Sequence, residues 1–136
     1  MSEEKSFDWY NFVKLANTYI DEDDPAKQRT GISRFYYGPF CSSRDLINEK
    51  QAYLNKKSRN IMTSKKGEVH LETRNIYRNH PAFRRNGKII AKNLDKLRKM
   101  RNKADYDKTT TQPLDKMLKN SKLRSERILE LLKEYN

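Results

Sequence analysis

The segment from Lys88 to Asp107 constrains the fold most strongly, because it carries an apolar stripe at helical spacing. The residues of the stripe are Ile90, Leu94, Leu97, Arg101 and Ala104. Alternating steps of four and three residues place them on one face of an α-helix. The segment therefore predicts a long amphipathic helix that packs against a helical core. One position of the stripe is an arginine, and burying a guanidinium is costly unless it is paired or lines a cleft.

Further helices are expected from capping signals and apolar periodicity. Ser6 is a candidate N-cap for a first helix that continues to about Ile20. Asp24 followed by Pro25 is typical of the N-cap and first residue of a second helix, which should bend or split at Pro39. The apolar face of this second helix comprises Ile32, Phe35, Tyr36, Phe40, Ser43, Leu46 and Ile47.

The rest of the chain predicts a loop, a short helix and a final helix. Residues 55–68 are polar, basic and weakly patterned, so we expect a flexible basic loop there. Val69 to Arg85 predicts a short helix interrupted before Pro81, and Gln112 to Tyr135 predicts the last helix. The fold class expected is all-α, a single domain over residues 1–136 built as an up-and-down bundle of four or five helices.

Composition agrees with one small helical domain. The chain has 136 residues, with 35% hydrophobic and 35% charged residues and only four glycines and four prolines. A single cysteine, Cys41, cannot form an internal disulfide, and no leader-like apolar run follows the N-terminus. No segment has the apolar length needed to cross a bilayer. We therefore expect a cytoplasmic protein with no membrane contact.

The positive charge is concentrated in the middle of the chain. Residues 55–103 carry 16 Lys+Arg against 3 Asp+Glu, whereas residues 1–54 carry 7 against 9. A block of this sign attracts polyanions through Coulomb attraction and counterion release, so RNA or DNA is the first partner to consider. Cationic segments also serve simply to keep a protein in solution, and charge alone does not decide between the two.

Polar residues beside Arg101 form the candidate active site. Arg101 and Asp105 are four residues apart and share a helix face, while Asn102 and Tyr106 lie on the adjoining face. A planar, permanently charged guanidinium is well suited to hold a phosphate. The alternative is purely structural: an ion pair between Arg101 and Asp105 that locks this helix to its neighbour.

The run LRKMRNKADYD from Leu97 to Asp107 resembles the signature of HEPN domains, in the prokaryotic branch whose motif ends in Ala-Asp-Tyr. Two other segments agree in order and spacing. Residues 32–46 resemble that branch's second helix, with a serine, a paired tyrosine, a phenylalanine and then Arg-x-Leu. His80, ahead of Phe83, stands where the branch often carries a histidine. Three features in order are much more specific than one arginine motif.

The resemblance implies a helical bundle, commonly a homodimer whose arginine helices meet in a shared cleft. Many HEPN proteins are metal-independent endoribonucleases of toxin–antitoxin or phage-defence systems, which implies RNA as substrate, no cofactor, and an antitoxin or nucleotidyltransferase as possible partner. In this chain the catalytic candidates are Arg101, Asn102, Asp105, Tyr106 and His80. The basic residues expected to bind nucleic acid are Arg84, Arg85, Lys88, Lys92, Arg98, Lys99 and Lys103.

The chain departs from the catalytic form of the motif, in which a histidine follows the arginine after four to six residues. Tyr106 stands in that place, and a phenol is a poor base at neutral pH. His80 could enter the cleft instead, Tyr106 could be activated by Arg101, or charge stabilisation could suffice. A further arrangement is Arg74 and Asn75 with His80, although this segment lacks the apolar stripe.

Two main functions stay open. In the first, Arg101 binds the scissile phosphate, Asn102 and Asp105 orient the groups, and Tyr106 or His80 moves the proton as the RNA 2′-hydroxyl attacks. In the second, the same cleft binds a nucleotide, RNA or protein without cleaving it, which the tyrosine in place of histidine favours. A DNA-binding regulator is a weaker third hypothesis, because no helix-turn-helix pattern is present.

Overall fold

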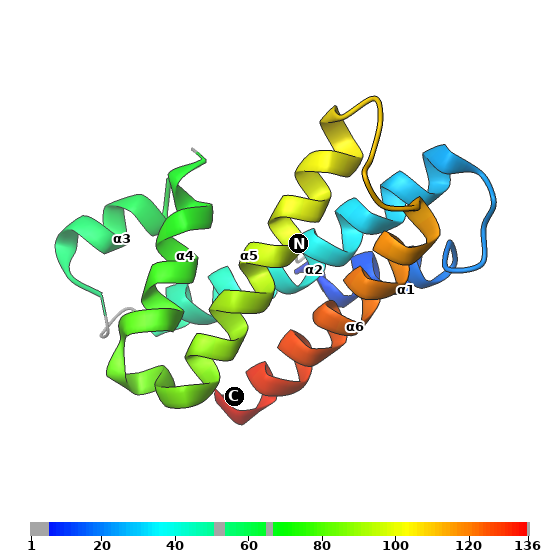
Figure 1. The fold of residues 1–136 in the computed structure, drawn as a ribbon. Helices are drawn as coiled ribbons and strands as arrows, with labels where there is room; N and C mark the ends of the chain where they lie inside the picture. Colours follow the sequence, from blue (N-terminus) through cyan, green and yellow to red (C-terminus); the bar gives the residue numbers. More distant parts are fainter. Residues whose placement is uncertain (1–5, 51–53, 65–66, 136) are drawn as a thin grey trace, which may run out of the picture.

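The protein is described by a computed structural model covering residues 6–50, 54–64 and 67–135, and these residues are helical with no strand among them (Figure 1). The α-helices are α1 (Tyr10–Asn17), α2 (Pro25–Glu49), α3 (Lys56–Met62), α4 (Glu68–Asn79), α5 (Arg84–Tyr106) and α6 (Leu114–Leu132). Two short 3-10 helices, η2 (Pro81–Phe83) and η3 (Lys133–Tyr135), follow α4 and α6. In the described residues, no helix is long and apolar enough to span a membrane.

The three long helices form the centre of an all-α bundle. Helix α2 packs against α1, α5 and α6, and α5 packs in addition against α4 and α6. Figure 1 shows α3 and α4 together at one end of the molecule, with α1 and the beginning of α2 toward the other. Helix α5 therefore packs against α4 on one side and against α2 and α6 on the other.

The apolar stripe of α5 is buried as its spacing predicts. Ile90, Leu94 and Leu97 have no exposed surface, and Ala104 is 2% exposed. Ile90, Leu94 and Leu97 belong to one core cluster with Tyr36 and Phe40 of α2. Ala104 belongs to a second cluster with Ile32 and Phe35 of the same helix. The predicted inward face of α6 is also buried from Met117 to Leu132. Asp24 caps α2 as expected, since its Oδ1 accepts a hydrogen bond from the Ala26 amide at 3.1 Å.

Several predicted boundaries were wrong. The first helix begins at Tyr10 instead of following Ser6, because the Asp8 carboxylate accepts the Tyr10 amide at 3.0 Å. It ends at Asn17, before Ile20. Helix α5 begins at Arg84, ahead of Lys88. Helix α2 continues through Pro39 as one element, so of the two outcomes predicted for this proline, a bend or a split, the split does not occur.

The predicted flexible loop over residues 55–68 contains helix α3. The Asn55 side chain caps it by accepting the Ser58 amide at 2.8 Å. The Ser58 hydroxyl then donates to Glu72 of α4 at 2.9 Å, and Met62 is buried at 2% exposure. These contacts with α4 order a segment whose own pattern is weak. Residues 65–66 of this prediction lie outside the described part of the chain.

Candidate nucleic-acid site

Arg101 is the centre of the site, and it is buried as the stripe predicts, with 8% exposure. Its Nη2 donates to the Tyr37 hydroxyl at 2.7 Å, and its Nη1 donates to Asn102 Oδ1 at 2.8 Å. The Nε lies 3.8 Å from Asp105 Oδ2. The pair expected between Arg101 and Asp105 is therefore present, and a tyrosine of α2 joins it.

Helix α5 is held at this end by an arginine from α2. Arg29 Nη1 donates to the carbonyl oxygens of Ala104 at 2.8 Å and Asp107 at 2.7 Å. Unpaired carbonyls at a helix C-terminus carry partial negative charge, and a cation that bonds to them fixes the last turn. Arg29 thus positions the turn that carries Asp105 and Tyr106. Sequence reasoning missed this residue, which lies 75 positions from Ala104.

Tyr106 lies at the mouth of the site. Its side chain is 78% exposed, and its ring centroid is 5.9 Å from the Arg101 guanidinium carbon. Asp105 is within reach of Ser33 on α2, whose hydroxyl is 3.5 Å from Asp105 Oδ2. Four of the five predicted catalytic residues, Arg101, Asn102, Asp105 and Tyr106, are thus brought together.

His80, the fifth, is not part of this group. It begins the 3-10 turn before α5, where its Nδ1 accepts the Ala82 amide at 3.1 Å. Helix α5 starts four residues later, and the rise from Arg84 to Arg101 is about 26 Å at 1.5 Å per residue. The two side chains therefore lie at different ends of the helix within one chain. Of the alternative group Arg74, Asn75 and His80, the last two line one recess. Arg74 does not line it, and its Nε lies 3.7 Å from Asp95.

A different histidine, His70 of α4, lies beside the site, and sequence reasoning missed it. Its Nδ1 is 2.5 Å from the Tyr36 hydroxyl, and its ring stacks on Phe40 with centroids 4.2 Å apart. Its centroid is 6.2 Å from that of Tyr37, the residue that binds Arg101. Burial, with the positive charges of Arg98 and Arg101 adding to it, lowers the pKa of His70 to about 4. The ring is therefore neutral at pH 7.

Positive charge from arginines of α5, α4 and α2 disfavours the protonated form of this histidine. Arg74, Arg98 and Arg101 each act on its ionisation, and burial followed by the charge of Arg98 lowers the pKa of Arg74 as well. Among the described residues, the buried atoms Arg74 Nη1, Arg98 Nε and Arg101 Nε have no hydrogen-bond partner. We call Arg74, Arg98, Arg101 and His70 the arginine cluster. Its N–H groups without acceptors and its excess of positive charge are what an anion would satisfy.

Comparison of the chain with protein-family models, curated proteins and solved structures finds no match. The site is therefore interpreted from its own geometry and from the resemblance of its sequence motif.

An open recess of about 270 Å³ gives access to the histidine side of the arginine cluster. Tyr37, His70 and Arg44 contribute to its wall. Cys41 also lines it but is buried, and burial raises the pKa of its thiol. Within the described residues, no group of three or more His, Cys, Asp or Glu side chains is placed to hold a metal ion.

The basic residues predicted to bind nucleic acid divide into two groups. Arg98 belongs to the arginine cluster. The others are exposed, and six basic residues spaced by three or four positions form a line along α5 away from its buried stripe. We call this line the basic stripe; its members are Arg85, Lys88, Lys92, Lys96, Lys99 and Lys103, of which Lys96 was not predicted. Arg84 is exposed beside it. Most of the predicted contacts therefore lie on the opposite face of α5 from Arg101.

Proposed function

We propose that this protein binds RNA through the arginine cluster and cleaves it without a metal ion, as an endoribonuclease of the HEPN type. The observation that carries the proposal is a group of three guanidiniums, each with a buried nitrogen that makes no hydrogen bond, whose charges act on a neutral histidine. Such an arrangement suits a phosphodiester, because each oxygen can accept a charge-assisted hydrogen bond. The resemblance of the Arg101 motif to HEPN signatures supports RNA as the substrate.

The arginines would hold the phosphate while His70 takes the proton. In the tautomer that carries hydrogen on Nδ1 and donates it to the Tyr36 oxygen, Nε2 of His70 has a free lone pair. It can accept the proton of the RNA 2′-hydroxyl as that oxygen attacks phosphorus. The bond from phosphorus to the 5′-oxygen breaks, and the exposed hydroxyl of Tyr106 can protonate the leaving oxygen. The products are a 2′,3′-cyclic phosphate and a 5′-hydroxyl end.

Substrate binding would adjust the histidine to this task. A base with a pKa near 4 is too weak to draw a proton efficiently at pH 7. A bound phosphate, however, neutralises the field of Arg98 and Arg101, which helps to hold that pKa down. The pKa of His70 therefore rises when RNA binds, and the histidine becomes a better base only when the substrate is present.

Cleavage of a 5′-labelled single-stranded RNA in the presence of EDTA tests the proposal. We expect product ends with a cyclic phosphate, a loss of rate of about a hundredfold or more in His70→Gln, and a larger loss in Arg101→Ala. His80→Gln serves as the matched control and should keep the full rate. Intact RNA at high enzyme concentration, or a rate unchanged in Arg101→Ala, would contradict the endoribonuclease assignment.

A non-catalytic RNA-binding module is the second candidate, and Tyr106 in the place of the motif histidine favours it. It predicts RNA affinity that depends on Arg101 with no new RNA ends. For either candidate, the resemblance to HEPN domains implies the same biological setting. In that setting the protein is a cytoplasmic homodimer of a toxin–antitoxin or phage-defence system, and its partner is an antitoxin or a nucleotidyltransferase. Sedimentation of the purified protein and the identity of neighbouring genes test this setting.

A further inference from the structure

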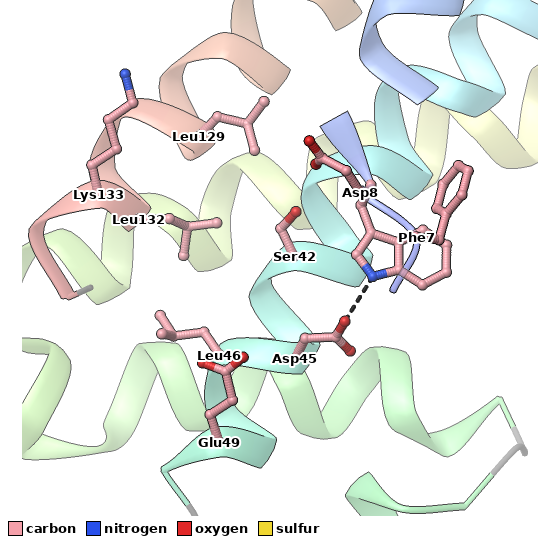
Figure 2. A pocket seen from close by; sticks show the side chains of 10 residues that line it. Phe7, Asp8, Ser42, Asp45, Leu46, Glu49, Leu129, Leu132 and Lys133 are labelled. Atoms are coloured by element: carbon pink, nitrogen blue, oxygen red, sulfur yellow. Dashed lines mark hydrogen bonds between the residues drawn. The ribbon is translucent and has the colours of Figure 1, made fainter. Parts of the chain in front are cut away.

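A second surface of the molecule has the opposite charge from the arginine cluster. An open recess of about 290 Å³ is lined from three elements. Figure 2 shows Leu129 and Leu132 from α6, Asp45 and Glu49 from α2, and Phe7 from the segment before α1. A neighbouring recess of about 680 Å³ shares Asp8, Leu129 and Lys133 with it. The two recesses form one groove beside α6, which we call the acidic groove.

The walls of the acidic groove combine rigid aromatic rings with aliphatic side chains. Phe7, Trp9 and Phe12 pack on one another with centroids 5.1 to 5.5 Å apart. The Trp9 indole, which lines the groove, donates to Asp45 at 2.7 Å, and this bond restrains the ring. Even so, Phe7 and Tyr10 are 52% and 49% exposed. Exposed aromatic side chains grouped beside leucines are typical of binding surfaces.

The charges of the acidic groove indicate the kind of occupant. Its lining includes five carboxylates, on Asp8, Asp45, Glu49, Glu126 and Glu130. Three of these carboxylates have cation partners: Asp45 is 2.9 Å from Arg44, Glu126 is 3.9 Å from Lys122, and Glu130 is 3.4 Å from Lys133. Within the described part of the chain, Asp8 and Glu49 form no ion pair. The protein as a whole carries a net charge of +12, so this concentration of carboxylates is local. Charges interact over about 8 Å at physiological salt, so a cation in the groove would sense the five carboxylates together with the three cations paired to them, which leaves a local excess of negative charge.

We propose that the acidic groove binds a basic amphipathic segment of a partner protein. An apolar side chain of the segment enters between Phe7 and Leu129, and its lysine or arginine side chains pair with the surrounding carboxylates. This is the helix-in-groove or extended-peptide mode of recognition, with apolar anchors for affinity and charges for specificity. The assignment is independent of the RNA site, because no residue of the arginine cluster lines the groove.

A second copy of the chain is a poorer occupant. Its basic stripe would have to enter the acidic groove, which joins two different surfaces. Contacts of this head-to-tail kind continue from copy to copy unless the rotation closes a ring. A short basic segment from another protein avoids this difficulty.

Trp9 provides a direct probe, since it is the one tryptophan of the sequence and it lines the groove. The full-length protein is titrated with a 12-residue peptide of lysine and leucine at amphipathic helical spacing, without aromatic residues. We expect a saturable change in Trp9 emission that weakens as salt is raised. A glutamate–leucine peptide should produce no such change, and a lysine–serine peptide should bind at least tenfold more weakly.

Charge reversal distinguishes the groove from general attraction to an acidic surface. The double variant Glu49→Lys with Glu126→Lys reverses the charge of two exposed groove carboxylates. Its affinity for the lysine–leucine peptide should be at least tenfold lower. Asp21→Lys with Asp23→Lys makes the same change in net charge at exposed positions outside the groove and should bind as the unchanged protein does. Equal weakening in both variants, or no response of Trp9, would overturn the proposal. Self-association in sedimentation that only the groove variant abolishes would also overturn it, in favour of a second copy.

Discussion

His70 shows how one side chain takes its properties from residues that are distant in the sequence. Its partner Tyr36 is 34 positions away on α2, and the arginines that repel its protonated form belong mainly to α5. Burial and positive charge act in the same direction on an imidazole, since both disfavour the imidazolium form. Tyr36 is affected as well: burial raises its pKa, so its hydroxyl remains protonated beside the ring. The site therefore holds a neutral hydrogen-bonded pair.

The lowered pKa of His70 makes stability depend on pH in a defined window. In the unfolded chain His70 titrates near 6.5, and in the folded protein near 4. Between these values the unfolded state binds more protons, so the His70 contribution is complete above pH 6.5 and is lost as pH falls toward 4. We expect a loss of about 2 kcal/mol, allowing for the partly exposed ring.

Urea unfolding from pH 7.5 to 4 measures this dependence. His70→Phe keeps an aromatic ring against Phe40 but cannot ionise, so its free energy of unfolding should fall less with acid than that of the unchanged protein. The difference between the two curves isolates His70 from the carboxylates, which are common to both. Parallel curves would show that the folded protein does not disfavour the protonated ring.

Local spacing predicts contacts within a helix and fails for contacts between helices. The pairing of Arg101 with Asp105 follows from their separation of four residues, and the structure confirms it. The sequence pattern indicated His80 and did not by itself place His70 beside the site, because the position of α4 against α2 is set by packing around Tyr36, Phe40 and Tyr77. One signal did exist: His70 and Arg74 are four residues apart, on the same face of the predicted short helix.

At the scale of elements, the long stripe of α5 was predictable and helix α3 was not. The stripe is specified by its own residues and would be amphipathic in any fold. Helix α3 has seven residues, too few for an isolated helix to be stable. Contacts with α4, such as that of Ser58 with Glu72, hold it in place. The sequence of residues 55–62 alone does not indicate that this segment packs against α4.

The close approach of α4 to the beginning of α5 depends on Gly87. A Cβ atom at this position would overlap the Tyr77 carbonyl oxygen and come within 2.6 Å of Phe83 Cβ. Gly87→Ala should therefore lower the free energy of unfolding by about 3 kcal/mol or more, because neither backbone can move without separating the helices. Gly67→Ala is the matched control: nothing lies within 4 Å of its added Cβ.

Denaturant unfolding of both glycine variants checks this prediction. We expect Gly67→Ala to change the free energy of unfolding by about 1 kcal/mol or less, toward greater stability, since alanine restricts the unfolded chain. If Gly87→Ala proved as stable as Gly67→Ala, the packing of α4 on α5 would be looser than the structure describes.

At the scale of the whole molecule, charge is separated onto different surfaces. The arginine cluster lies between α5, α4 and α2, the basic stripe follows the opposite face of α5, and the acidic groove lies beside α6. The block of positive charge over residues 55–103 was evident in the sequence. Its division into a buried cluster and an exposed stripe was not, because it depends on which face of α5 meets α2 and α4.

This separation predicts that long and short RNA are bound differently. An RNA long enough to reach both faces of α5 would contact the basic stripe as well as the arginine cluster, whereas a dinucleotide reaches the cluster alone. Lys88→Gln, Lys92→Gln and Lys96→Gln together remove three exposed charges of the stripe. Each phosphate contact on single-stranded RNA adds about 0.7 to the magnitude of the slope of log affinity against log salt. For a 20-nucleotide RNA, the magnitude of this slope should therefore be about 2 smaller in the triple variant than in the unchanged protein.

Anisotropy titrations at salt concentrations from roughly 50 to 300 mM measure the slope, because phosphate contacts weaken strongly over this range. Lys14→Gln, Lys116→Gln and Lys119→Gln remove the same charge from exposed positions on α1 and α6 and should leave the slope nearly unchanged. Dinucleotide affinity should be the same in both triple variants and fall only in Arg101→Ala. If both triple variants lowered the slope equally, net charge alone would attract the RNA and the basic stripe would have no specific role.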